Sequence, residues 1–254
     1  SMIQKFLTGW PKDIKVAATF LLRIPIPVPY DMWEKGLTTA IRAFPIIGGF
    51  VGLISGLIMY LLLNTNFPPL LCALGAIMFQ ILVTGALHED GLADFTDGIG
   101  GGKDQQQCLK IMRDPRIGTF GVLALIFSVG FRVSALASIP ASEILVALIA
   151  AGLFSRSLVP IPMLFLIPAQ ENGLGASAGK PEISAATTAI LIGVVPLFFF
   201  FTFYQASLII ILCFAILVAL MFIAQKKLGG FTGDVLGALQ QLTETAVLVL
   251  IAGW

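Results

Sequence analysis

The feature that most constrains this chain is a series of apolar runs, each about as long as a helix that crosses a membrane. Such a helix needs about 20 apolar residues, and several stretches reach or nearly reach that length. They are Ala43–Leu63, Phe67–Leu87, Ile117–Ile139, Ile144–Ile167, Ile183–Phe203, Ser207–Ala224 and Val235–Trp254. The runs are continuous rather than alternating, which favours helices over the strands of a membrane barrel. We therefore expect an all-α, polytopic membrane helix bundle with about seven transmembrane helices.

The composition agrees with a chain that resides in a lipid bilayer. Only 11% of the 254 residues are charged, whereas a soluble domain carries about 25%. So few charges cannot cover the molecule with polar surface, and we expect the lipid bilayer to surround it. The net charge of +1 gives no reason to expect a nucleic-acid partner. We find no soluble second domain in the pattern, so residues 1–254 are predicted to form a single integral-membrane domain.

The basic residues predict the orientation of the bundle. Arg132 and Arg156 lie inside apolar runs, and the other Lys and Arg residues fall on one side of the predicted spans. These are Lys5, Lys12, Lys15, Arg23, Lys35, Arg42, Lys103, Lys110, Arg113, Arg116, Lys180, Lys226 and Lys227. The connections on the opposite side, near residues 64–66, 140–143 and 204–206, contain no Lys or Arg. The positive-inside rule then predicts a cytoplasmic N-terminus and an external C-terminus.

A cluster of acidic residues follows the second apolar run. It contains Glu89, Asp90, Asp94 and Asp97. On a helix the three aspartates share one face and Glu89 lies at its edge, because successive residues are about 100° apart. Carboxylates that converge in this way repel one another unless a cation neutralises them, and oxygen ligands suit Mg²⁺, Mn²⁺ or Ca²⁺ better than Zn²⁺. We predict a metal site here; a solvated acidic loop is the alternative.

Residues next to the acids could complete an active site. His88 is either a general base for an attacking hydroxyl or an interfacial histidine that only supports the site, since on an ideal helix it points away from Asp90. Arg113 and Arg116 could bind phosphate oxygens as bidentate forks, or could serve only as basic anchors beside the membrane. We interpret residues 88–118 as one cytoplasmic acidic and basic active-site segment.

A second polar segment precedes the last apolar run. It contains Gly229, Gly230, Thr232, Gly233 and Asp234. Glycines and a threonine at the start of a helix offer backbone N–H groups and the positive end of the helix dipole to an anion. The segment is expected on the same side as the acidic residues and is predicted to bind substrate. A flexible turn with an aspartate cap is the alternative.

Three charged residues lie within apolar runs. Intramembrane charges usually pair with one another or face a wet cavity, so we expect Arg156 and Glu244 to pair or to line a substrate cavity. Arg132 is expected to extend outward to the membrane surface. The glycines at 48, 49, 52 and 56 allow close helix packing, within one chain or in a homo-oligomer.

These motifs resemble those of one family, the cobalamin synthases, also called adenosylcobinamide-GDP ribazoletransferases. The segment from His88 to Gly98 has the family pattern H-x-D-G-L-A-D-x-x-D-G. Residues 111–121 are similar to I-M-K-D-S-R-x-G-T-Y-G, with Arg113, Pro115 and Phe120 in place of Lys, Ser and Tyr. The segments 20–27, 44–48 and 229–234 also look like family motifs, so the resemblance spans nearly the whole chain.

The resemblance implies the last condensation in the synthesis of the vitamin B12 nucleotide loop, in the bacterial inner membrane. Adenosylcobinamide-GDP and α-ribazole, or its 5′-phosphate, would give adenosylcobalamin, or its 5′-phosphate, and GMP. Asp90, Asp94 and Asp97, with Glu89, would hold Mg²⁺. Arg113 and Arg116 would stabilise the departing phosphate, His88 or a carboxylate would accept the hydroxyl proton, and residues 229–234 would hold the second substrate.

Two other functions are compatible with parts of the pattern. Asp90-Gly91-Leu92-Ala93 begins like the motif of CDP-alcohol phosphotransferases, but the arginine and the later aspartates of that motif are missing at the required spacing. A cation transporter could also use intramembrane acids. Its acids should lie near the middle of the membrane, whereas most of the acids here lie at the predicted cytoplasmic edge.

Overall fold

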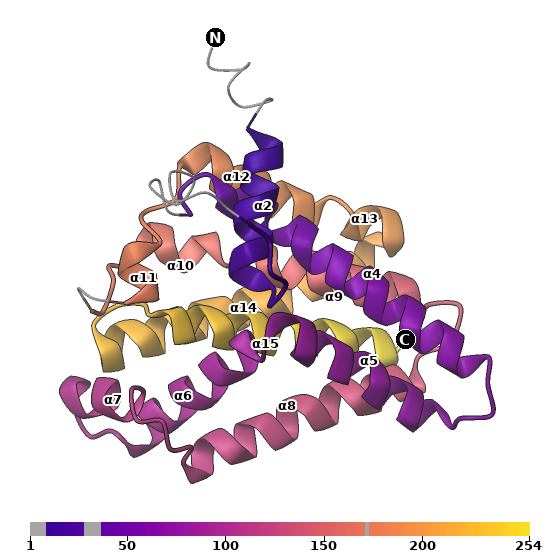
Figure 1. Cartoon of the computed structure of the whole chain (residues 1–254), viewed down its shortest axis with the longest axis horizontal. Coiled ribbons are helices and arrows are strands. Elements are labelled where there is room, and N and C mark those ends of the chain that lie inside the picture. The colour runs from indigo at the N-terminus through magenta and orange to yellow at the C-terminus, as the bar shows by residue number, and fades with distance from the viewer. Residues whose placement is uncertain (1–8, 28–36, 171–172) are drawn as a thin grey trace.

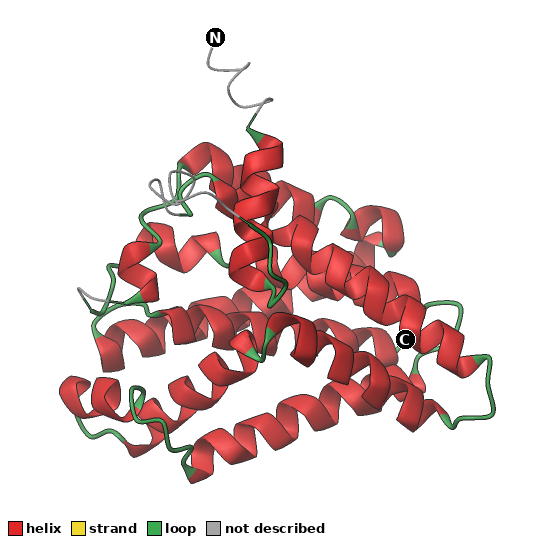
Figure 2. Cartoon of the chain, viewed as in Figure 1, coloured by secondary structure: helices red, strands yellow, loops and turns green. Residues whose placement is uncertain are grey.

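The computed structural model describes residues 9–27, 37–170 and 173–254, which form a helical bundle (Figure 1). Across these described residues the structure has no β-strand (Figure 2), and its only β-type pairing is an isolated bridge between Pro168 and Phe231. The predicted all-α class is therefore confirmed. Lys5 and Lys35, two of the basic residues from which the orientation is predicted, lie outside the described residues.

The helices follow one another along the chain with short connections. They are α2 (Trp10–Leu21), the 3₁₀ helix η1 (Ala40–Ala43), α4 (Phe44–Leu63), α5 (Pro69–Thr84), α6 (Leu87–Gly101), α7 (Gln105–Ile111), α8 (Thr119–Ser138), α9 (Ile144–Ser157), α10 (Pro160–Phe165), α11 (Leu174–Ser177), α12 (Ile183–Val194), α13 (Leu197–Phe200), α14 (Phe203–Leu228) and α15 (Gly233–Ala252). Among the described residues, 6 helical segments are long and apolar enough to cross a membrane, or 7 if the bent pair α5 and α6 counts as one span. This agrees with the predicted number of about seven.

The second predicted span differs from the structure. Helix α5 is only 16 residues long, and α6 continues from it at an angle of 87°. Gly85 and Ala86 at the junction both have left-handed backbone conformations, with φ of 62° and 56°, which an α-helix cannot contain. The expectation of one continuous span over Phe67–Leu87 is therefore wrong, because the chain turns sharply just before the acidic residues.

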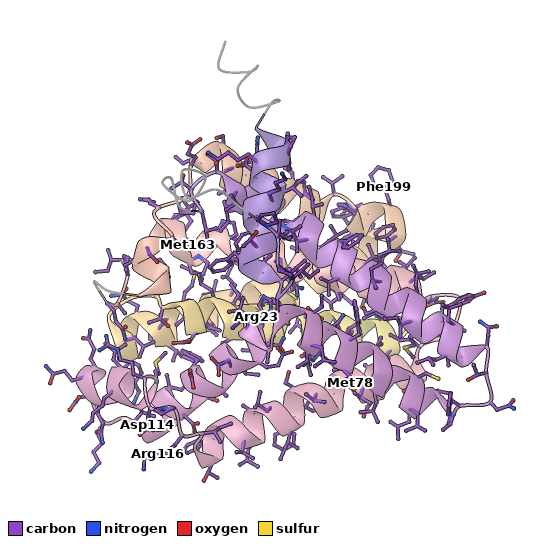
Figure 3. The ribbon with its side chains drawn as sticks, viewed as in Figure 1. Arg23, Met78, Asp114, Arg116, Met163 and Phe199 are labelled. Carbon is purple, nitrogen blue, oxygen red and sulfur yellow. The ribbon has the colours of Figure 1, made fainter. Side chains whose placement is uncertain are left out.

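The helices divide into a central group and a peripheral group. In the segment Ile144–Phe165, formed by α9 and α10, 72% of the residues in the most apolar stretch are buried. The corresponding fraction for α14 is 28%. Large apolar side chains on the peripheral helices point outward; Phe199 is 84% exposed and projects from the bundle in Figure 3. A surface with so many exposed apolar groups suits lipid rather than water.

The glycine-rich face of α4 packs against α9 inside the same chain. A Cβ added to Gly48 or Gly52 would collide with the backbone of Gly152 or Leu148, and one added to Gly152 would collide with Gly48. The two backbones approach closely because no side chains intervene, as is common between membrane helices. The close packing expected from these glycines is therefore intramolecular, and a homo-oligomer stays a prediction.

The connections gather at two ends of the bundle. In Figure 1 the C-terminus and the connection between α4 and α5 lie at one end, and α7 and α11 lie at the other. At the second end, Ala169 donates a backbone hydrogen bond of 2.8 Å to Phe231, and Phe231 donates one of 2.9 Å to Ile167. The loops that follow α10 and α14 are thus joined. This end carries the basic residues around α7 and those in the last turn of α14 (Figure 1), while the orientation in a membrane stays a prediction.

Candidate active site

Helix α6 carries the acidic residues and lies between α8 and α15, against both of which it packs. A Cβ added to Gly91 would be 3.1 Å from the Cα of Asp234, and one added to Gly237 would be 3.3 Å from the Cα of Gly91. The first turns of α6 and α15 therefore cross at a point where both helices have glycine. The acidic segment is helical, as predicted, and its position inside the bundle places the acids of two distant motifs together.

Glu89 and Arg132 form an ion pair in the interior of the bundle. Arg132 Nη2 lies 3.2 Å from Glu89 Oε1, and the two side chains are 1% and 9% exposed. The expectation that Arg132 extends outward is wrong, because Glu89 provides a partner inside the protein and an ion pair removes the need to reach water. The other oxygen of Glu89, Oε2, accepts no hydrogen bond from a described residue, and the metal-ligand role of Glu89 stays a prediction.

A second intramembrane pair joins Arg156 to Glu244. Arg156 Nη1 donates to Glu244 Oε2 at 2.9 Å, which confirms the pairing expected for these two residues. Both side chains are at most 5% exposed. Removing either charge would leave the other buried without a partner, so the pair holds α9 and α15 in register.

Two glutamines connect the ion pairs into one hydrogen-bonded network. Gln241 Nε2 donates to Glu89 Oε1 at 3.2 Å and to Gln240 Oε1 at 2.9 Å. Gln240 in turn donates to the carboxylate of Glu244. We call Glu89, Arg132, Gln240, Gln241, Glu244 and Arg156 the buried polar network. It links α6, α8, α9 and α15 through side chains that hydrogen-bond to one another in the core.

Gln240 and Gln241 are not among the residues predicted from the sequence. Their signal in the sequence is a pair of adjacent amides inside an otherwise apolar run. Such polar residues in a predicted membrane helix are expensive to bury and usually face the interior of the bundle. The pattern could therefore have marked α15 as a helix with polar partners, although it could not have named those partners.

Asp97 connects the two motifs of the acidic and basic segment. Its carboxylate accepts hydrogen bonds from the backbone N–H groups of Gly118, at 2.7 Å, and Gly121, at 2.8 Å. These amides belong to the first turn of α8, where N–H groups lack partners within the helix and a negative charge is favourable. A Cβ at Gly118 or Gly121 would collide with the Asp97 carboxylate. Asp97 thus caps α8 in this structure, and a metal-ligand role for it stays a prediction.

Three carboxylates in the first two turns of α6 and the first turn of α15 have no basic partner among the described residues. Asp90 and Asp94 lie on successive turns of α6, and Asp234 lies in the first turn of α15. Asp94 is within electrostatic range of both Asp90 and Asp234. Asp234 is also held weakly by the Thr232 hydroxyl, at 3.5 Å. We call Asp90, Asp94 and Asp234 the acidic trio.

The acidic trio has the donor chemistry of a magnesium site. Within the described part of the chain, no three or more His, Cys, Asp or Glu side chains are arranged to hold a metal ion by themselves. Magnesium does not need such a set, because it commonly takes one or two carboxylates together with substrate phosphates and water. Carboxylates that influence one another electrostatically and have no basic partner among the residues described supply that partial set, so these residues fit Mg²⁺ as an ion bound together with substrate.

A cavity opens beside the first turns of α6 and α15. Its polar lining includes His88, Asp90, Arg156 and Asp234. His88 and Asp90 are far apart around the axis of α6, yet both line the cavity. The structure therefore brings together a histidine, two aspartates and an arginine that lie in three separate parts of the sequence.

A second cavity adjoins the first at Gly175, Gly233 and Asp234, which line both. Its other lining residues include Gln170, Phe231 and Thr232. Thr232 is the N-cap of α15 and its hydroxyl accepts a hydrogen bond from the N–H of Val235, as expected for a helix that begins at this segment. Among the predicted loop residues, Thr232, Gly233 and Asp234 therefore line a cavity.

The remaining glycines of this loop shape the backbone. Gly229 ends α14 with a φ of 75°, a conformation that glycine adopts without strain. A Cβ added to Gly230 would collide with the carbonyl oxygen of Ile167. Gly230 thus allows the loop after α14 to pack against the loop after α10. A contact of Gly229 or Gly230 with substrate stays a prediction.

The two predicted catalytic arginines lie in different surroundings. Arg113 donates a hydrogen bond of 3.3 Å to Gln170, a residue that lines the second cavity. Arg116 instead pairs with Asp114 at 2.8 Å, and the Arg116 side chain is 86% exposed. Figure 3 shows Asp114 and Arg116 at the edge of the molecule. Neither arginine lines either of the two cavities in this structure; Arg113 adjoins the second cavity through Gln170, whereas Arg116 hydrogen-bonds to Asp114, which lines neither cavity.

Comparison with known proteins decides the family. Residues 13–252 match the family model described as cobalamin-5-phosphate synthase. This chain belongs to the cobalamin-5-phosphate synthase family. The adenosylcobinamide-GDP ribazoletransferase of Sinorhizobium medicae (strain WSM419) is 42% identical over 250 residues, which cover 94% of this chain and 95% of that protein. The resemblance inferred from the motifs is thus confirmed over nearly the full length.

Other members of this family have the same extent. The adenosylcobinamide-GDP ribazoletransferase of Rhizobium meliloti (strain 1021) is 41% identical over 94% of this chain and 95% of its own length. The protein of that name from Bradyrhizobium diazoefficiens is 39% identical over 95% of this chain and 94% of its own length. No solved structure matches this chain. Membership of the family decides against a CDP-alcohol phosphotransferase and against a cation transporter.

Proposed function

We propose that this chain transfers adenosylcobinamide phosphate from adenosylcobinamide-GDP to α-ribazole or its 5′-phosphate, with release of GMP. The observation that carries the proposal is the cavity at which His88, Asp90, Arg156 and Asp234 meet, in a chain whose relatives are named for this transfer. Phosphoryl transfer depends mainly on positioning the reactants and neutralising charge. A site with acids, an arginine and a histidine supports that chemistry.

The proposed reaction exchanges one bond to phosphorus for another. The 3′-hydroxyl of the ribazole attacks the phosphorus atom that is bonded to the cobinamide arm, and a new P–O bond forms. The phosphoanhydride bond breaks, and GMP leaves with the bridging oxygen. The hydroxyl proton passes to a base on the protein. His88 and Asp90 both line the cavity, and either could accept this proton.

Each substrate needs its charge neutralised by particular residues. Asp90, Asp94 and Asp234 would hold Mg²⁺, which when bound supplies positive charge beside the diphosphate. Arg113 reaches the second cavity through Gln170, and we assign it to the phosphate of the departing GMP. Thr232 presents its hydroxyl at the same cavity. The buried polar network keeps Arg156 at the wall of the first cavity, where it can face an anionic group.

We further propose that the protein lies in the bacterial inner membrane with both cavities toward the cytoplasm. The apolar helices support a multi-pass membrane protein. The loops that follow α10 and α14 meet at the end of the bundle that also carries α7, and this end holds Lys103, Lys110, Lys226 and Lys227. Basic loops favour the cytoplasmic side, which is also the side of a soluble nucleotide product.

An assay of the purified full chain in lipid nanodiscs tests the proposal. We expect GMP release from adenosylcobinamide-GDP only when α-ribazole or its phosphate is present, and loss of release when Mg²⁺ is chelated. Comparing kcat/KM for the two acceptors identifies the preferred one. Absence of GMP release with both acceptors, in folded protein supplied with Mg²⁺, would disprove the proposed function.

Asp94→Ala tests the magnesium assignment separately. We expect turnover to fall by about 10²-fold or more, because electrostatic groups at a reacting centre contribute on that order. The matched control is Glu143→Gln, which removes an exposed carboxylate before α9, outside both cavities. Undiminished turnover of Asp94→Ala with unchanged dependence on Mg²⁺ would remove Asp94 from the site.

A further inference from the structure

The first cavity has two chemically different sides. Its polar groups belong to His88, Asp90, Arg156 and Asp234, on α6, α9 and α15, whereas the part of the lining that comes from α2, η1 and the start of α4 is apolar throughout and forms the apolar side. The apolar lining residues are Phe20, Leu21, Leu37, Ile41, Phe44, Leu87, Val159, Met163, Ala178 and Leu236. Half of them come from the segment that runs from α2 to the first residue of α4. A ligand that fills this space must therefore combine an apolar portion with a portion that carries hydroxyl or phosphate groups.

The apolar side is built on a fixed support. Arg42 Nε lies 2.6 Å from Asp13 Oδ2 in an ion pair whose side chains are 4% and 5% exposed. The Thr39 hydroxyl donates to the other oxygen of Asp13 at 3.0 Å, and the guanidinium of Arg42 lies 4.3 Å from the centre of the Trp10 ring. These contacts tie α2 to η1, so the wall is formed before any ligand enters, as is usual for small-molecule sites.

Two aromatic rings in this wall are already stacked. The centroids of Phe20 and Phe44 are 5.7 Å apart and their planes differ by 22°. Phe44 is buried at 2% exposure, whereas Phe20 is half-buried. Phe20 therefore keeps an accessible ring surface at the cavity, and a flat aromatic ligand can pack against it in an offset arrangement.

The two cavities offer different surroundings for the two substrates. The second cavity carries Gln170 and Thr232, with Arg113 beside it. The first cavity adds the apolar wall, and both share Asp234. A transfer between two substrates has to occur where their sites meet, which here is beside the acidic trio.

We infer that the apolar side of the first cavity binds the aromatic base of the acceptor nucleoside and selects for a base without polar edges. This inference rests on the proposed function. The benzimidazole ring of a ribazole is flat and has carbon atoms along most of its edge. Guanine carries several N–H and carbonyl groups, which Phe20, Ile41 and Phe44 cannot pair, and unpaired buried polar groups are unfavourable. The polar side of the cavity then receives the ribose, with its 3′-hydroxyl toward His88 and Asp90.

Phe20→Ala tests this assignment by steady-state kinetics in nanodiscs. We expect the KM for α-ribazole to rise about tenfold, while kcat and the KM for adenosylcobinamide-GDP change less than about twofold, because uniform binding of one substrate is lost. Phe20→Leu should fall between Phe20→Ala and the wild type. The matched control is Phe50→Ala, which removes a phenyl ring that is 55% exposed on the outer face of α4, and it should leave all three constants unchanged.

Competition by the free base provides a second test that needs no variant. We expect 5,6-dimethylbenzimidazole to inhibit competitively against α-ribazole and not against adenosylcobinamide-GDP. In calorimetry without adenosylcobinamide-GDP, this base should bind more weakly to Phe20→Ala than to the wild type. An unchanged KM for α-ribazole in folded Phe20→Ala, or a rise in the KM for adenosylcobinamide-GDP instead, would overturn the inference. In that case GMP release by the wild type would still support the proposed function. Absence of GMP release would contradict the function itself, and calorimetry would still report on the base.

Discussion

The buried polar network and the acidic trio begin at adjacent residues of one helix and have opposite surroundings. Glu89 points into the bundle, where Arg132 and Gln241 contact it. Asp90 lines the cavity and has no basic partner among the described residues. A step of about 100° around the helix separates the two directions. Of these two neighbouring carboxylates, Glu89 stabilises the fold because it has a cationic partner, and Asp90 stays accessible to a ligand because it has none in the described part of the chain.

The largest effect expected from this comparison is on turnover at Asp90. Asp90→Asn removes a charge that faces the cavity and that is repelled by Asp94 and Asp234. We expect GMP release to fall by about 10²- to 10³-fold, with no loss of thermal stability, because no ion pair is broken. A variant that unfolds at a much lower temperature than the wild type would show that Asp90 belongs with the structural charges.

The next effect is on stability, at Arg132. Arg132→Leu leaves Glu89 buried without its cation, and breaking a buried pair in this way destabilises a protein by about 3–5 kcal/mol. Unfolding of detergent-solubilised protein measures this change. The double variant Glu89→Gln with Arg132→Met removes both charges together and should recover most of the loss. Equal stability of Arg132→Leu and the wild type would contradict a structural role for the network.

The smallest effect is expected at the exposed pair of Asp114 and Arg116. Hydrogen bonds from Arg116 lower the pKa of the Asp114 carboxyl to about 2. A carboxyl with a lowered pKa stabilises the folded state above its unfolded pKa, and this contribution is lost as the pH falls toward 2. Because both groups are exposed to solvent, we expect Asp114→Asn to leave the unfolding temperature at pH 7 unchanged within error. A decrease of several degrees would mean that surface charges also hold this fold together.

Much of the fold could be predicted because the signals are local. The apolar runs indicated the membrane helices, and the regular spacing of the acids indicated that residues around Asp90 and Asp94 are helical. The helix in the predicted run Phe67–Leu87 ends at Thr84, because the left-handed conformations of Gly85 and Ala86 produce a turn. Hydropathy reports only whether a segment is apolar, so it cannot detect a sharp change of direction within an apolar run.

The site could be predicted only in part. The motifs named His88, Asp90, Asp94, Asp97 and Asp234, but they could not show which groups each carboxylate contacts, and the metal-ligand role of Asp97 stays a prediction. In the structure Asp97 caps α8 through the amides of Gly118 and Gly121. The apolar wall around Phe20 was not expected either, because its role depends on the fold of the N-terminal segment over a cavity formed by distant helices.

By itself, the sequence determined the all-α membrane class, the family and the residues with reactive side chains, because hydropathy, helix periodicity and motif spacing are properties of short segments. The tertiary structure decided the partner of each charge. Whether a carboxylate meets an arginine, a helix N-terminus or a cavity depends on which helix packs against that face, and those contacts join residues up to 152 positions apart, as between Glu89 and Gln241.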